Sequence, residues 1–139
     1  MANVHSWSAT FALPHTVLGI RTEGNALTRI EFLPSDTAAV PADTPLARRV
    51  IEQLRAYLSN PDFVFDLPLA LRGSAHAQRV WQAMQQIAPG AVRTYGDIAA
   101  EIGSSPRAVG QACGANPIPV IIPCHRVVSR AGHGGFMHR

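Results

Sequence analysis

Apolar, β-branched and aromatic residues are concentrated in two segments near the start of the chain, 11–20 and 26–32. The turn-forming sequence Glu23-Gly24-Asn25 lies between them. We therefore predict two strands joined as a hairpin. The next segment, 34–45, is rich in Pro, Ala, Asp and Thr and is expected to be a loop.

Apolar residues then recur at helical spacing over 46–58, which predicts a helix with one buried face. Its apolar positions are Leu46, Val50, Ile51, Leu54, Tyr57 and Leu58. Asp43 or Thr44 is expected to cap this helix, with Pro45 as its first residue. An extended linker over 61–73 follows, so we place a boundary near Gly73, between an N-terminal α/β domain, 1–73, and a second domain, 74–139.

The second domain begins with a predicted helix that Ser74 opens and Pro89-Gly90 stops. Its buried face is expected to consist of Ala77, Val80, Trp81, Met84 and Ile87. Two short helices come next. Thr94 caps the first, with Asp97 completing a capping box, and Gly103 closes it.

The second short helix is predicted from Pro106 to about Gly114. Two short helices with a tight turn between them are typical of a helix-turn-helix, although an ordinary αα-corner has the same pattern. Arg107 and Gln111 are the long polar residues of this helix, and small residues surround them. Reading of base edges in the major groove requires more long polar side chains. The composition therefore favours minor-groove binding guided by shape, with Arg107 reaching into the base stack.

Composition and charge narrow the class of protein. Apolar residues make up 47% of the 139 residues and charged residues 15%, which is typical of a globular protein. Residues 1–70 contain five Arg and seven acidic residues, whereas residues 71–139 contain seven Arg and two acidic residues. This asymmetry indicates an anionic partner for the second half, although a solvated basic face fits it equally well.

Neither a membrane span nor a signal peptide is predicted. The two cysteines cannot form a disulfide framework, so we expect a cytoplasmic protein with reduced thiols. The scattered His and Cys residues predict no metal site, and no cofactor is expected.

Cys124 is the candidate nucleophile. Pro123 places it on a bend, and the neighbouring His125 and Arg126 favour a thiolate. Asn116, a short way upstream, is positioned to tie a turn together. A buried, inert cysteine and a structural histidine remain the alternative interpretation.

The segment 116–128 resembles the active-site signature of the O6-alkylguanine-DNA alkyltransferases, through its Pro-Cys-His-Arg-Val motif. The sequence from Arg107 to Gly110 matches the recognition helix of that family, and Thr94-Tyr95 matches an upstream element. The hairpin, the helix near 44–58 and the linker starting at Asp66 are similar as well. The resemblance therefore covers nearly the whole chain.

This resemblance implies an α/β fold, with a small ribonuclease-H-like N-terminal part and a mostly helical, winged-helix-like DNA-binding part. It implies direct, stoichiometric repair: a flipped O6-alkylguanine in duplex DNA gives its alkyl group to Cys124. The family's roles would be distributed as follows: catalytic, Cys124 and His125; substrate-binding, Tyr95, Asn116 and Val127; DNA-binding, Thr94, Arg107, Ala108, Gln111 and Arg126. The expected partner is double-stranded DNA carrying the lesion, bound by a monomer.

Members of the family continue into a helical segment whose glutamate orients the histidine, whereas this sequence has no acidic residue after Glu101. A shortened chain, a naturally short homologue, and another group in place of the glutamate all fit this difference. An inactive protein that binds O6-alkylguanine and recruits repair factors is the alternative function. A helix-turn-helix transcriptional regulator is a third, which the few long polar residues of the second helix disfavour.

Overall fold

The computed structural model describes residues 7–129, which divide into two units between Ala70 and Leu71. The first unit contains a three-stranded antiparallel sheet of β1 (Ala9–Ala12), β2 (Val17–Glu23) and β3 (Ala26–Leu33), in that order. The predicted hairpin is confirmed, because β2 and β3 pair on either side of Gly24 and Asn25. Gly24 adopts a positive φ of 60°, as a tight hairpin turn requires.

The prediction of one continuous strand over 11–20 is wrong. The segment contains the end of β1, a turn and the start of β2, with Ala12 paired to Val17. The N–H of Leu13 donates to the Thr16 carbonyl at 2.9 Å and closes this turn. Pro14 explains the break, because it has no N–H to donate to a strand ladder.

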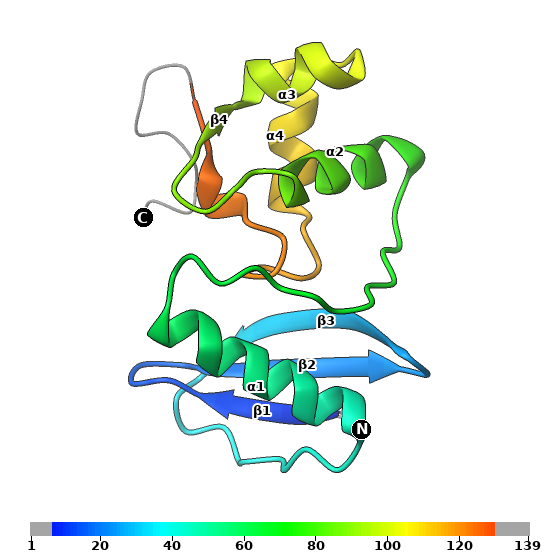
Figure 1. Ribbon diagram of the computed structural model, residues 1–139. Helices are drawn as coiled ribbons and strands as arrows, with labels where there is room; N and C mark the ends of the chain where they lie inside the picture. Colours follow the sequence, from blue (N-terminus) through cyan, green and yellow to red (C-terminus); the bar gives the residue numbers. More distant parts are fainter. Residues whose placement is uncertain (1–6, 130–139) are drawn as a thin grey trace. The chain divides into compact units, whose positions relative to one another are not determined.

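Helix α1 (Pro45–Ser59) lies along one face of the sheet (Figure 1). The Thr44 side chain accepts the Ala47 N–H at 3.1 Å, and Pro45 occupies the first turn, as predicted. Val50 and Leu54 are buried in the core of this unit, whereas Leu58 is 59% exposed, contrary to its expected place on the buried face. Leu58 is in the last turn of the helix, beyond Leu54, the last of its buried residues.

The second unit consists mainly of α2 (Ala75–Gln85), α3 (Tyr95–Ile102) and α4 (Pro106–Gly114). Ser74, Thr94 and Ser105 cap the three helices through side-chain oxygens that accept backbone N–H groups. Thr94 and Asp97 form the predicted capping box, with both bonds at 2.9 Å. The mixed α/β class is therefore confirmed, with the sheet in the first unit and the helix-turn-helix in the second.

Two contacts hold the helices and the segment after Cys124 together in the second unit. The buried Trp81 indole N–H of α2 donates to the Ala112 carbonyl of α4 at 2.9 Å. A short parallel pair then joins β4 (Arg93–Thr94) to β5 (Val127–Val128). This pair fixes the segment that follows Cys124 to the start of α3. In the described part of the chain, no helix is long and apolar enough to cross a membrane.

The turn between α3 and α4 depends on Gly103, whose φ of 72° lies in the left-handed region. We expect Gly103→Ala to lower the free energy of unfolding by about 1–2 kcal/mol, because a Cβ is disfavoured there. Urea denaturation followed by circular dichroism measures this change.

Gly110→Ala is the matched control, because Gly110 lies inside α4 and its added Cβ would meet no atom within 4 Å. It should raise the free energy of unfolding by about 0.5–1 kcal/mol. Equal effects of the two substitutions would contradict the role of the left-handed turn.

Candidate functional site

Asn116 links the end of α4 to the candidate nucleophile. Its side-chain NH₂ donates to the Ile122 carbonyl and to the sulfur of Cys124, both at 2.8 Å. Its side-chain oxygen accepts the Ile118 N–H at 2.9 Å. One amide therefore closes the loop between residues 116 and 124, which is the turn expected from the sequence.

The backbone of this loop is irregular. The Ile122 N–H donates to the Ile118 carbonyl at 2.9 Å, and Val120 between them has a φ of 76°. A β-branched residue rarely adopts this conformation, and strain of this kind is often found next to functional sites. Nothing in the sequence signals the strained position, because valine is neither a turn residue nor a glycine.

Cys124 begins a single 3₁₀ turn, η2 (Cys124–Arg126), and is only 5% exposed. Its thiol donates to the Cys113 carbonyl at 3.4 Å. Burial raises the pKa of Cys124, while the hydrogen bond from Asn116 and one from the backbone act in the opposite direction. The thiol is therefore protonated at neutral pH, and formation of a thiolate requires a proton acceptor.

His125 follows directly and has an exposed side chain. Desolvation and, to a smaller extent, the charge of Arg126 lower the pKa of His125. The imidazole is therefore neutral at pH 7 and able to accept a proton. Arg126 donates to the Ile87 carbonyl at 2.9 Å and so anchors η2 to the segment after α2. Its contact with DNA stays a prediction.

Tyr95 is the first residue of α3. Burial, followed by the proximity of Cys113 and Cys124, raises its pKa, so the phenol keeps its proton and can donate a hydrogen bond. Thr94, Tyr95 and Pro106 contribute to the walls of a hollow of about 560 Å³ between the first turns of α3 and α4. Val127 is 1% exposed in β5, and its N–H donates to the Cys124 carbonyl, so its contact with a substrate stays a prediction.

Helix α4 has one buried and one exposed face. Arg107 and Gln111 are exposed, and Ala108 is partly exposed. On the buried face, the Cys113 thiol donates to the sulfur of Met84 at 3.7 Å. Burial raises the pKa of Cys113 to about 12, as is typical of a cysteine that packs in a core.

The predicted residues thus gather at two places in the second unit. Tyr95 and Asn116 lie near the thiol of Cys124, and Arg107 and Gln111 occupy the exposed face of α4. The sequence did not indicate that the carbonyls of Ile87 and Cys113 accept hydrogen bonds from Arg126 and Cys124, because every residue has a backbone carbonyl. In residues 7–129, no group of three His, Cys, Asp or Glu side chains is arranged to hold a metal ion.

By its fold and site, this is a two-unit α/β protein with a helix-turn-helix. A loop after the second helix carries a buried cysteine, which accepts a hydrogen bond from an asparagine side chain. Residues 75–139 match the family model described as the DNA-binding domain of 6-O-methylguanine DNA methyltransferase. The methylated-DNA–protein-cysteine methyltransferase of Mycobacterium tuberculosis H37Rv is 39% identical over 94% of this chain and 85% of its own length. The chain belongs to the family of methylated-DNA–protein-cysteine methyltransferases.

Other relatives agree with this assignment. The constitutive methylated-DNA–protein-cysteine methyltransferase of Bacillus subtilis is 42% identical over 63% of this chain and 54% of its own length. A crystal structure of Mycobacterium tuberculosis OGT in complex with DNA superposes with a TM-score of 0.76. The two sequences are 37% identical, and the match covers 88% of this chain and 79% of the chain in the crystal structure. The described fold is therefore that of solved alkyltransferase structures.

The hydrogen bond from Asn116 to the sulfur predicts a pH effect. Asn116→Ala removes the donor and should raise the pKa of Cys124 further. Because the thiolate then forms at higher pH, we expect alkylation by a free O6-alkylguanine base to slow about tenfold at pH 7. The rise of the rate with pH should shift to higher pH. Intact-protein mass spectrometry over a pH series measures both.

Asn116→Asp is the companion variant, since its oxygen can still accept the Ile118 N–H while the donor to sulfur is lost. It should shift the profile in the same direction as Asn116→Ala. A profile identical to that of the wild type, in a folded Asp variant, would show that the donor is irrelevant to the thiolate.

Proposed function

We propose that this chain repairs double-stranded DNA by transferring the alkyl group of an O6-alkylguanine to the sulfur of Cys124, once per molecule. The observation that carries the proposal is the position of the Cys124 sulfur: Asn116, two residues after the end of α4, donates a hydrogen bond to it at 2.8 Å. The family of the chain supplies the reaction class, and DNA is its partner. No observation favours the alternative of a lesion-binding protein without activity.

The reaction needs a thiolate at a buried sulfur. We propose that the neutral His125 accepts the Cys124 proton through a water molecule, and that the N–H of Asn116 stabilises the resulting charge. The sulfur then attacks the alkyl carbon, so that an S–C bond forms and the bond to O6 breaks. The electron pair stays with guanine, and the proton that His125 took from Cys124 returns through water to restore the N1–H of the base. The thioether is a poor leaving group, and the protein is consumed.

A base inside the duplex must leave the stack before its O6 substituent reaches Cys124. We propose that α4 approaches the minor groove and that Arg107 fills the vacated space, because small residues surround it on the exposed face. Ala108 allows close approach, and Gln111 and Thr94 contact the backbone. Flipping costs a few kcal/mol and is easier for a poorly paired, damaged base.

We propose that the backbone of Val127 and the protonated phenol of Tyr95 bind the flipped base. We assign to Arg126 a contact with DNA, made by the guanidinium N–H groups that do not donate to the Ile87 carbonyl. We further propose a cytoplasmic location, where the two unpaired thiols would stay reduced.

The direct test uses a duplex that contains one O6-methylguanine. The wild-type chain should gain the mass of one methyl group, mapped to Cys124, and then react no further. Cys124→Ser should gain none and bind the duplex with unchanged affinity, because the substitution leaves α4 intact. A methyl group on Cys113, or none in the wild type, would refute the assignment of the acceptor.

The role of Arg107 is tested by comparing two substrates. Arg107→Ala should slow repair of the duplex at least about tenfold, because a few kcal/mol of flipping cost are no longer offset. Its reaction with a free O6-alkylguanine base should remain within about twofold of wild type. Equal slowing on both substrates would rule out a role in flipping.

A further inference from the structure

Negative charge in the second half of the sequence is confined to two residues on one helix. Asp97 and Glu101 are the only acidic residues between 71 and 139. They lie four positions apart on α3, and both side chains are about half exposed. The remainder of this half carries arginines as its only formally charged residues.

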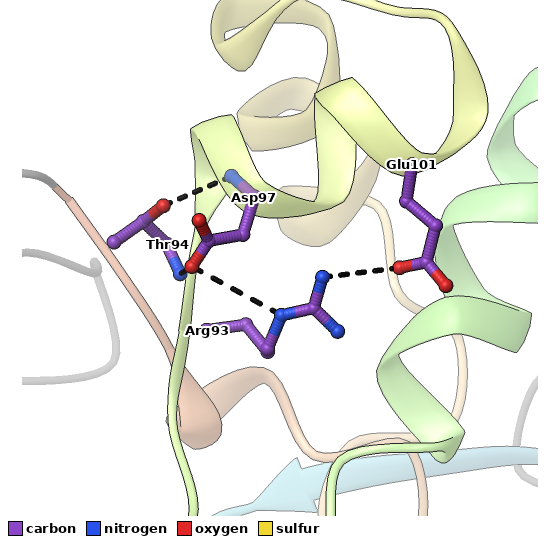
Figure 2. Close-up of polar contacts among 4 residues, drawn as sticks. All are labelled: Arg93, Thr94, Asp97 and Glu101. Carbon is purple, nitrogen blue, oxygen red and sulfur yellow. Dashed lines mark hydrogen bonds and ion pairs between the residues drawn. The ribbon is translucent and has the colours of Figure 1, made fainter.

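Arg93 lies beside both carboxylates (Figure 2). One Arg93 nitrogen, Nη2, is 3.2 Å from Glu101 Oε1, and another, Nε, is 4.0 Å from Asp97 Oδ2. The same Asp97 oxygen accepts the Thr94 N–H at 2.9 Å in the capping box. Asp97 is therefore fixed at the start of α3 by the local structure, and its charge cannot move away from an approaching ligand.

The position of Asp97 matters for DNA binding. Asp97 contributes to the wall of the hollow between the first turns of α3 and α4, next to Pro106. In helix-turn-helix proteins the first helix crosses the phosphate backbone while the second enters a groove. DNA docked on α4 would thus bring phosphates toward Asp97, where like charges repel.

Stability alone does not explain the arrangement. Arg93 is 36% exposed, and ion pairs at this degree of exposure contribute little to folding. The effect of these charges on the binding of a polyanion is larger, because many phosphates interact with the same local charge. Within this group of three side chains, the guanidinium of Arg93 changes the summed charge from −2 to −1.

We propose that Arg93 is an electrostatic shield, which neutralises part of the carboxylate charge on α3 so that DNA phosphates can approach the helix-turn-helix. The inference rests on the proposed function, because it takes α4 as the DNA-binding helix. Arg93 acts through its ion pairs and makes no contact with a phosphate itself. The affinity for any duplex, damaged or undamaged, therefore depends on the balance between Arg93 and its two partners.

The test measures the affinity for an undamaged DNA duplex by fluorescence anisotropy, with the full chain. Arg93→Gln should weaken binding about three- to tenfold at about 0.05 M salt, and the effect should shrink at about 0.2 M salt. Glu101→Gln should tighten binding about twofold. The double variant, R93Q with E101Q, should return to within about twofold of wild type.

The double variant separates a shield from a direct contact. If Arg93 itself bound a phosphate, removal of Glu101 would not restore binding, and the double variant would be as weak as Arg93→Gln. That result would overturn the proposal. Reaction of Arg93→Gln with a free O6-alkylguanine base should equal that of the wild type, and a slower reaction would indicate a distorted site instead of a charge effect.

A matched control comes from the first unit. Arg29 and Glu31 form an ion pair at 3.0 Å, with side chains 47% and 46% exposed. Arg29→Gln removes the same charge and should change the affinity less than about twofold. An equal effect at both sites would show that only net charge matters. A wild-type chain that does not bind duplex DNA would refute the proposed function, and this inference with it.

Discussion

The hydrogen bonds of the Asn116 side chain are the constraint on which the candidate site depends. Three prolines between Asn116 and Cys124 remove backbone donors from this segment, so no regular helix or strand can form there. A buried polar group without a partner is costly. One amide satisfies the Ile118 N–H and the Ile122 carbonyl and still has an N–H for sulfur. The same bonds that close the loop therefore also place the nucleophile.

Burial and reactivity oppose each other at Cys124. Exclusion of water raises the pKa of the thiol, which disfavours the nucleophilic form. The same exclusion strengthens each hydrogen bond that the thiolate receives. A neutral His125 follows Cys124 in the sequence and a protonated Tyr95 lies near it, and the proposed transfer uses the first as proton acceptor and the second as hydrogen-bond donor. A protein used once per lesion needs a protected thiol more than a permanently ionised one.

Local signals in the sequence were sufficient for the helices. Thr44, Ser74, Thr94 and Ser105 each cap a helix, because side-chain oxygens satisfy the first N–H groups wherever they occur. The boundaries of the strands were not encoded in the same local way. The break between β1 and β2 is set by a turn and by pairing with a neighbouring strand, so composition alone did not separate the two. The exposed Leu58 likewise depends on how much of the unit covers the end of α1.

The sequence by itself determined the two short helices with a tight turn between them and the bend that bears Cys124, since each is encoded within a few neighbouring residues. It also determined the surplus of arginine in the second half, which is a matter of composition alone. Only the tertiary structure decided which partners those residues meet. It directs Arg126 to the Ile87 carbonyl, Arg93 to two carboxylates and the Cys124 thiol to the Cys113 carbonyl. Backbone carbonyls are the same in every residue, and a long arginine reaches many partners, so packing of distant segments alone selects among them.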